Sequence, residues 1–73
     1  DARDALRAQL LGTILNLRNG SNPFATGPDI RPTVSAAKGF LFSHPTAVTA
    51  DHPDRATAIG LKDTLDAYNN SGE

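Results

Sequence analysis

The chain contains no cysteine, methionine or tryptophan among its 73 residues. Without cysteine it can form neither a disulfide nor a thiolate metal site, so its apolar core alone must hold the fold together. Seven basic and eight acidic residues leave a formal charge of −1 at pH 7, whereas nucleic-acid binding normally needs a basic surface. A domain of this size hides only about 60% of its unfolded surface. We therefore expect neither a nucleic-acid partner nor a large buried active site.

Long apolar runs are missing as well. A membrane-spanning helix needs about 20 predominantly apolar residues, and every apolar stretch of this chain is much shorter. No basic start followed by an apolar core resembles a signal peptide. Because the chain begins at Asp1 and has no methionine, we expect residues 1–73 to be a single helical module that was excised or processed from a longer chain.

Three segments have the periodicity of amphipathic helices. The first is predicted over about residues 2–18. The second begins after Asp29 or Arg31 and ends at residues 44–45, and the third is capped by Asp51 and stops in the Asn-rich stretch near the C-terminus. The predicted inner faces carry Leu6, Leu10, Ile14 and Leu17; Ile30, Val34, Ala37 and Leu41, flanked by Phe40 and Phe42; and Ala58, Leu61, Leu65 and Tyr68. The pattern predicts an all-α fold, a small three-helix bundle.

A loop rich in proline and glycine should join the first two helices. Residues 20–28 include two prolines and two glycines, a density that excludes regular structure. Phe24 is the one large apolar side chain of this loop, so we expect it to fold back over the open end of the core.

Three glycines, Gly12, Gly39 and Gly60, fall inside the predicted helices. Each costs about 1 kcal/mol relative to alanine in a helix interior. We expect close helix crossings at these positions, with loose packing as the alternative.

His44 and His52 are the candidates for proton transfer or metal ligation near neutral pH, and Ser43, Asp51 and Asp54 lie near them in sequence. The histidines are eight residues apart across a proline, so they do not form the i, i+4 pair of a helical zinc motif. We interpret them as loop histidines that cap a helix or face solvent. We accordingly predict no catalytic residue, no metal ligand and no cofactor, with a small hydrolytic or metal site on these histidines as the enzymatic alternative.

Oxygen-bearing side chains surround Gly20 in a way that invites comparison with a calcium loop. They are Asn16, Asn19, Asn22 and Asp29. A calcium loop has acids or amides at alternating positions before its glycine, but Leu15 and Leu17 stand there. We interpret the asparagines as helix caps, and leave open whether the Asn-rich helix ends bind calcium.

Several stretches together resemble a small helical module found toward the C-terminal end of large secreted or surface-attached bacterial proteins. They are residues 6–11, 15–20, 33–41 and 61–70, of which the last contains Leu-Asp-Ala-Tyr-Asn-Asn. The resemblance implies an extracellular or cell-surface location and a role as an accessory or interaction domain, and it implies no catalytic residues. Modules of this family often contain cysteine or lie beside cysteine-rich stretches. The lack of cysteine here argues against covalent anchoring.

The leading hypothesis is a non-catalytic interaction or docking module of a secreted or surface bacterial protein, with a protein as its partner. We expect its binding patch to include whichever of Phe24, Phe42 and Tyr68 are exposed. The alternative is a structural subunit or segment of an extracellular assembly, such as a filament or multiprotein complex. The sequence encodes neither the identity of the partner, nor the activity of the parent protein, nor the oligomeric state.

Overall fold

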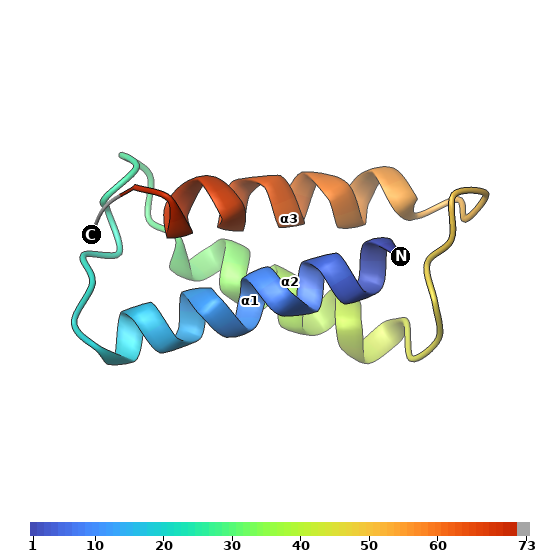
Figure 1. Ribbon diagram of the computed structural model, residues 1–73, viewed down its shortest axis with the longest axis horizontal. Coiled ribbons are helices and arrows are strands. Elements are labelled where there is room, and N and C mark those ends of the chain that lie inside the picture. Colours follow the sequence, from blue (N-terminus) through green and yellow to red (C-terminus); the bar gives the residue numbers. More distant parts are fainter. Residues whose placement is uncertain (72–73) are drawn as a thin grey trace.

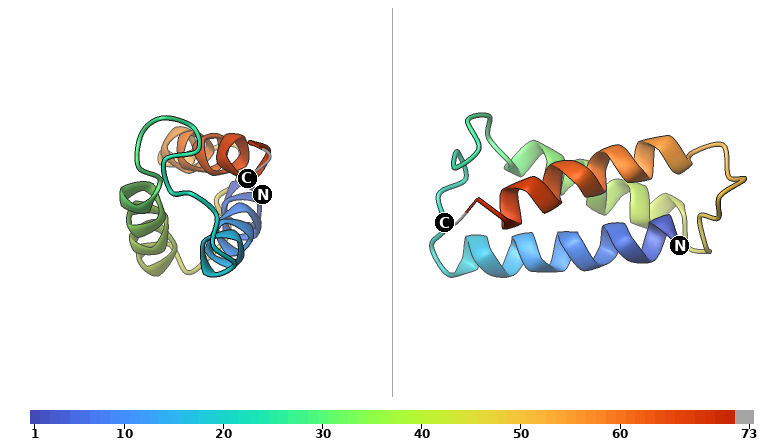
Figure 2. Two further views of the ribbon diagram at one scale, coloured as in Figure 1. Left: turned by 90° about the vertical axis from the view of Figure 1, so that its left-hand side faces the viewer. Right: turned by 45° about the horizontal axis from the view of Figure 1, so that its top comes forward.

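The computed structural model describes residues 1–71 and contains three α-helices. They are α1 (Ala2–Arg18), α2 (Arg31–Ser43) and α3 (Arg55–Asn69). α2 runs antiparallel to the other two, so α1 and α3 begin at the end of the bundle where α2 finishes (Figure 1). Seen end-on, the helices form a triangle (Figure 2). No strand occurs within residues 1–71, and the prediction of an all-α bundle is confirmed.

The residues at its two ends set the bounds of α1. Asp1 Oδ1 accepts the amide of Asp4 at 3.1 Å, which satisfies one of the free donors of the first turn. At the other end Gly20 has a φ of +92°, a left-handed conformation that glycine adopts without strain. The predicted range of this helix is therefore confirmed.

α2 also begins and ends near its predicted bounds. Asp29 Oδ1 accepts the amide of Arg31 at 3.0 Å, and Pro32 occupies the first turn, where a missing amide hydrogen costs little. The helix ends at Ser43, because the position before Pro45 disfavours helical backbone.

α3 begins later than predicted. Its N-cap position is Asp54, so the prediction that Asp51 caps the helix is wrong. Residues 50–54 instead form turns, in which the Arg55 amide donates to the His52 carbonyl at 3.1 Å. Pro53 therefore lies in this turn and outside the first turn of the helix.

A single core runs along the triangle between the helices. Its buried apolar residues are Ala2, Leu6, Leu10, Ile30, Val34, Ala37, Phe40, Val48, Ala58, Leu65 and Tyr68. Phe40 was expected only to flank the inner face of α2, but it is buried, whereas Leu41 is partly exposed. Val48 closes one end of the core from the loop after α2, and its carbonyl accepts the Ala2 amide at 3.1 Å.

The glycines inside the helices differ in their surroundings. A Cβ on Gly12 would stand 3.3 Å from Nδ2 of Asn69, so this glycine marks a close approach of α3 to α1. A Cβ on Gly39 or Gly60 would meet nothing within 4 Å. The expectation of close helix crossings is therefore right at Gly12 and wrong at the other two positions.

Beside Gly12, neutral polar side chains join α3 to α1; we call this group the amide network. Asn69 Oδ1 accepts from Asn16 Nδ2 at 3.0 Å, and Asn69 Nδ2 donates to the backbone carbonyl and side-chain Oε1 of Gln9 at 3.1 and 2.8 Å. The fully buried Thr13 hydroxyl lies within hydrogen-bond distance of Asn69 Oδ1 and of the Gln9 carbonyl, and its one proton can go to either. Each buried polar atom of the network thus has a partner.

Candidate functional site

The three side chains expected in a binding patch differ widely in exposure. Phe42 is 90% exposed on the last turn of α2, and Phe24 is 50% exposed in the loop before that helix. Tyr68 is only 2% exposed, and its hydroxyl donates to the Asn22 carbonyl at 2.9 Å. Because only exposed side chains were expected in the patch, Phe42 and Phe24 remain candidates for partner binding. Tyr68 belongs to the core.

Phe24 does not cover the open end of the core. Its ring instead lies under the guanidinium of Arg31, whose Cζ is 5.6 Å from the ring centroid, a cation–π distance. Ala25, the next residue, packs against the core in its place. The loop is held by the Tyr68 hydroxyl and by the Ile30 amide, which donates to the Pro23 carbonyl at 2.9 Å.

Besides the two phenylalanines, two leucines of α1 form an exposed apolar patch that the sequence reasoning missed. Leu11 is 56% and Leu15 is 60% exposed. They are four residues apart, and at 100° per residue they fall on the side of α1 opposite the buried Leu6 and Leu10. The signal was present in the sequence, because both leucines lie outside the apolar stripe of this helix.

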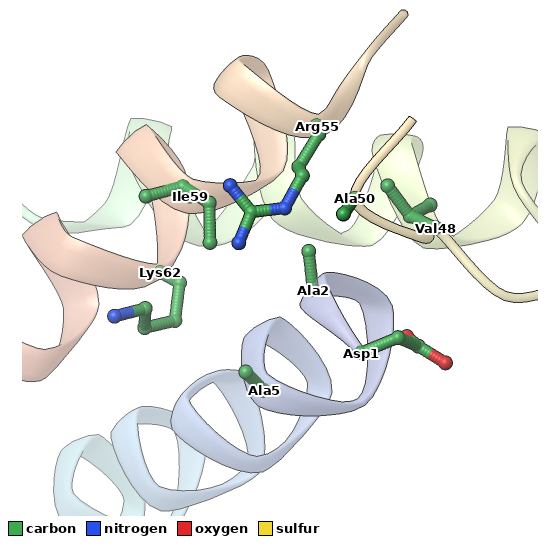
Figure 3. Close-up of a pocket in the computed structure, with 8 residues that line it drawn as sticks. All are labelled: Asp1, Ala2, Ala5, Val48, Ala50, Arg55, Ile59 and Lys62. Carbon is green, nitrogen blue, oxygen red and sulfur yellow. The ribbon is translucent and has the colours of Figure 1, made fainter. Parts of the chain in front are cut away.

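A hollow of about 400 Å³ lies between the first turns of α1 and α3 and the loop that carries Val48 (Figure 3). Arg55 reaches into it from α3, beside Ile59. Lys62 is held by Asp63 at 2.6 Å, and this hydrogen bond raises the pKa of Lys62. The polar side chains that line the hollow are exposed or half-buried, so no buried polar group is fixed in place to hold a ligand.

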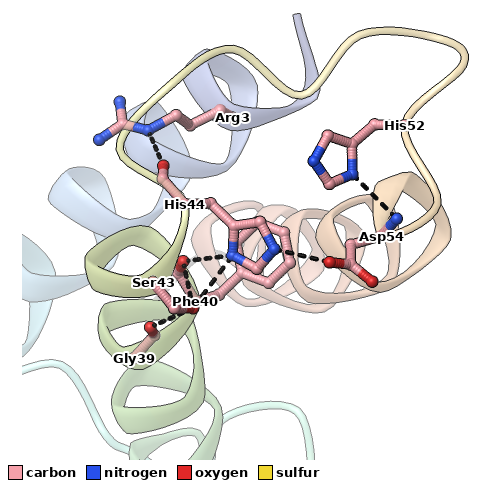
Figure 4. Close-up of polar contacts among 7 residues, drawn as sticks. All are labelled: Arg3, Gly39, Phe40, Ser43, His44, His52 and Asp54. Carbon is pink, nitrogen blue, oxygen red and sulfur yellow. Dashed lines mark hydrogen bonds and ion pairs between the residues drawn. The ribbon is translucent and has the colours of Figure 1, made fainter.

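Ionisable side chains meet at the junction between α2 and α3, in what we call the histidine cluster: His44, His52 and Asp54 (Figure 4). His44 Nε2 lies 2.7 Å from Asp54 Oδ2. His52 Nδ1 accepts the Asp54 backbone amide at 3.0 Å, and its ring stands edge-on to that of His44, with centroids 5.6 Å apart. The chain between residues 44 and 52 loops back on itself, which the linear spacing could not show.

His44 serves as the C-cap of α2, as the capping interpretation expected. Its Nδ1 lies 2.8 Å from the Phe40 carbonyl, and its ring stacks on the Phe40 ring with centroids 3.9 Å apart. The Arg3 Nε donates to the His44 carbonyl and so joins α1 to this corner. The hydrogen bond to Asp54, followed by that to the Phe40 carbonyl, raises the pKa of His44. A cation here also complements the negative end of the α2 dipole.

Ser43, His44 and Asp54 contact one another in the order of a hydrolase triad, but their geometry does not activate the serine. Ser43 Oγ lies 3.0 Å from His44 Nδ1, the nitrogen that also faces the Phe40 carbonyl. A carbonyl oxygen only accepts, so this nitrogen carries a proton and cannot take the one on Ser43. The Ser43 hydroxyl is also within reach of the Gly39 and Phe40 carbonyls of its own helix.

Two of the oxygen-bearing side chains around Gly20, those of Asn22 and Asp29, make local hydrogen bonds. Asn22 Oδ1 accepts the Phe24 amide and Asp29 Oδ1 the Arg31 amide, both at 3.0 Å. Asp29 also binds the Arg31 guanidinium, and this side-chain bond, followed by the backbone bond, lowers the pKa of Asp29. Asn16 belongs to the amide network. Asn19 is the C-cap residue of α1, and Asn22 and Asp29 hold local turns, as the interpretation expected. For Asn16 the interpretation is wrong, because its side chain bonds across the bundle to α3.

Comparison of the chain with protein-family models, with curated proteins and with solved structures found no match. Within residues 1–71, no helix has the length and apolar character needed to cross a membrane.

Proposed function

We propose that the chain is a non-catalytic interaction or docking module that holds its parent protein to a protein partner. The observation that supports this proposal is Phe42, a large aromatic side chain left 90% exposed although the core is complete without it. Burying such a side chain on binding gains about 1.5–3 kcal/mol. Exposed aromatic anchors are also typical of the residues that dominate binding energy at protein interfaces.

The module is proposed to act outside the cell, as part of a secreted or surface-attached bacterial protein. Support comes from the resemblance of residues 61–70 and the stretches before them to modules of such proteins. An antibody against the chain should label intact cells of the source. Labelling that appears only after lysis would contradict this location.

Photo-crosslinking tests the docking role directly. A photoreactive phenylalanine analogue at Phe42 should capture a specific protein from the envelope fraction of the source. The same analogue at Thr57, an exposed polar position on α3, serves as the control and should not. Unlabelled wild-type chain should compete for the capture, and a Phe42→Ser chain should compete less well. Equal capture at both positions, or equal competition by both chains, would refute the proposal.

A specific feature of α1 favours the assembly alternative as a second candidate. Asp4, Leu11 and Arg18 are all exposed and follow one another at intervals of seven residues, so they share the outer face of the helix. In an antiparallel pair of α1 helices centred on Leu11, each Asp4 would face the Arg18 of the other copy. Leu11 and Leu15 would supply the apolar contact.

Sedimentation velocity over a range of concentrations tests this self-association. Wild-type chain should form a dimer as the concentration rises, and Arg18→Asp should weaken the dimer by placing two acids opposite each other. The double variant Asp4→Arg/Arg18→Asp should restore it, because exchanging the charges restores both pairs. A monomer at every concentration, or a dimer that is insensitive to both variants, excludes this contact.

A further inference from the structure

We propose that the histidine cluster is a binding site for a divalent transition-metal ion of the zinc type. The observation that carries this inference is the juxtaposition of two imidazoles and a carboxylate, each with a ligand atom within 4.8 Å of the others. Imidazole nitrogen and carboxylate oxygen are common ligands of zinc in proteins. The proposal does not depend on the docking role, since neither Phe42 nor α1 contributes a ligand.

His44 is already oriented as a metal ligand. In a metal-binding histidine, one ring nitrogen coordinates the ion while the N–H of the other is usually held by a carbonyl or carboxylate. His44 Nδ1 faces the Phe40 carbonyl at 2.8 Å, and stacking on the Phe40 ring fixes the plane of the imidazole. Nε2 is thereby left as the coordinating atom, and it points at Asp54 Oδ2.

A bound ion would take the place of the proton that lies between His44 and Asp54. Their atoms are 2.7 Å apart, whereas two ligands of a tetrahedral zinc ion are about 3.3 Å apart, given bonds of about 2.0–2.1 Å. A small rotation of the Asp54 side chain opens this gap, because that side chain is half exposed and makes no cap bond to α3. Metal binding to this pair therefore releases a proton.

His52 needs the larger adjustment. Its Nδ1 accepts the Asp54 amide, and a neutral imidazole has only one further nitrogen, which then carries the proton. To coordinate a metal, His52 must give up this amide bond or exchange its two nitrogens by turning the ring. Because Asp54 is exposed, water can satisfy the released amide. Two histidines and one carboxylate complete three protein positions, and water fills the fourth.

The ligand set also determines which ions should bind. Imidazole suits zinc, copper and nickel, whereas calcium and magnesium prefer sites made wholly of oxygen atoms. We expect Zn²⁺ to bind and Mg²⁺ and Ca²⁺ not to compete at equal concentration.

Isothermal titration calorimetry of the whole chain with Zn²⁺ tests the site. We expect saturable one-to-one binding, weakened at least about tenfold in His52→Ala and in Asp54→Asn. Asp51→Asn is the matched control, since Asp51 is an exposed acid of the same loop outside the cluster, and it should bind like the wild type. Circular dichroism should show that each variant is as helical as the wild type.

Nuclear magnetic resonance of the imidazoles in the wild-type chain tests the same site without any substitution. On adding Zn²⁺, His44 should coordinate through Nε2 and keep its proton on Nδ1, His52 should shift with the same affinity, and a chelator should reverse both changes. Absence of zinc binding, or binding that leaves the imidazole resonances unmoved, would overturn the proposal. The cluster would then serve only to hold α2 against α3.

Discussion

Where α3 ends, it is joined to α1 by neutral amides and a hydroxyl; where α3 begins, it is joined to α2 by ionisable groups. Asn69 and the buried Thr13 represent the first end, and the half-buried His44 with the exposed Asp54 the second. Hydrogen bonds between neutral groups keep their strength across the pH range in which histidine titrates. The amide network should therefore hold α3 against α1 equally well across this pH range, whereas the histidine cluster can respond to protons and, as proposed above, to metal ions.

The largest effect is expected at the neutral end. Asn69→Ala leaves the Gln9 side chain and Asn16 Nδ2 without their partner, so it should lower the free energy of unfolding by about 1–3 kcal/mol. The loss should be the same at about pH 5.5 and about pH 8. Urea denaturation measures it. Asn70→Ala is the control, because Asn70 is exposed and bonds only within α3, and it should stay within about 0.5 kcal/mol. Equal losses of stability in the two variants would show that the amide network does not stabilise the packing of α3 against α1.

Alanine substitution of the three helical glycines should have opposite effects on stability at the close contact and at the open positions. Gly39→Ala and Gly60→Ala should each raise the free energy of unfolding by about 0.5–1 kcal/mol, because the new methyl group meets nothing within 4 Å. Gly12→Ala should lower it, since the methyl group would press on Asn69, whose amide is held on both sides by hydrogen bonds. Thermal unfolding compares the three variants. If Gly12→Ala instead raised the free energy of unfolding as much as the other two variants, the Asn69 side chain would have to move aside at no cost.

At the ionisable end, stability should depend on pH in the metal-free protein. Asp54 raises the pKa of His44, while His52 stands against the same ring and Arg3 binds the His44 carbonyl. The contribution of protonated His44 is complete below about pH 6.5, the pKa of an unfolded histidine, and is lost as the pH rises through its folded-state pKa. With a chelator present, an imidazole titration by nuclear magnetic resonance should place the pKa of His44 above its usual range.

Two variants check the cause of that shift. Asp54→Asn should bring the pKa of His44 down, because it removes the carboxylate that stabilises the imidazolium. Asp51→Asn should leave it unchanged. The same pKa of His44 in both variants would show that Asp54 does not hold the proton.

The smallest effect is expected at the ion pair between Asp29, just before α2, and Arg31, the first residue of that helix. Arg31→Gln should raise the pKa of Asp29 toward its ordinary value, since the bond to the Arg31 side chain is the main cause of its lowering. The stability linked to Asp29 is present above about pH 3.9 and is lost as the pH falls through the lowered pKa, so neutral stability should hardly change. Lys38→Gln, on the same helix, should not shift Asp29. Carboxylate titration by nuclear magnetic resonance decides this.

The helices were largely predictable because their bounds depend on local chemistry. Asp1 as a cap and Gly20 in a left-handed conformation act within a turn of the residues they affect. The start of α3 was not predictable in this way. Asp51 and Asp54 are equally good caps by residue type, so the sequence does not decide between them. In the fold Asp54 occupies the N-cap position and contacts a histidine ten residues earlier in the chain.

The histidine cluster and the amide network could not be predicted from the sequence, because both depend on contacts between residues that are far apart in the chain. Asn69 meets Gln9 across 60 positions, and only the packed bundle brings them together. The exposure of Leu11 and Leu15, by contrast, was readable from their spacing, because a helix with leucines on two faces can bury only one of them here.

Tyr68 is the single tyrosine of a chain that lacks tryptophan, and it is buried with its hydroxyl bonded to the Asn22 carbonyl. Its ultraviolet absorbance and emission thus come from one site next to the amide network. The imidazole resonances of the two histidines come from the junction between the end of α2 and the start of α3, which lies at the opposite end of the bundle (Figure 1). The chain therefore carries an intrinsic reporter at each end, and whether the two ends unfold together can be followed without attaching a label.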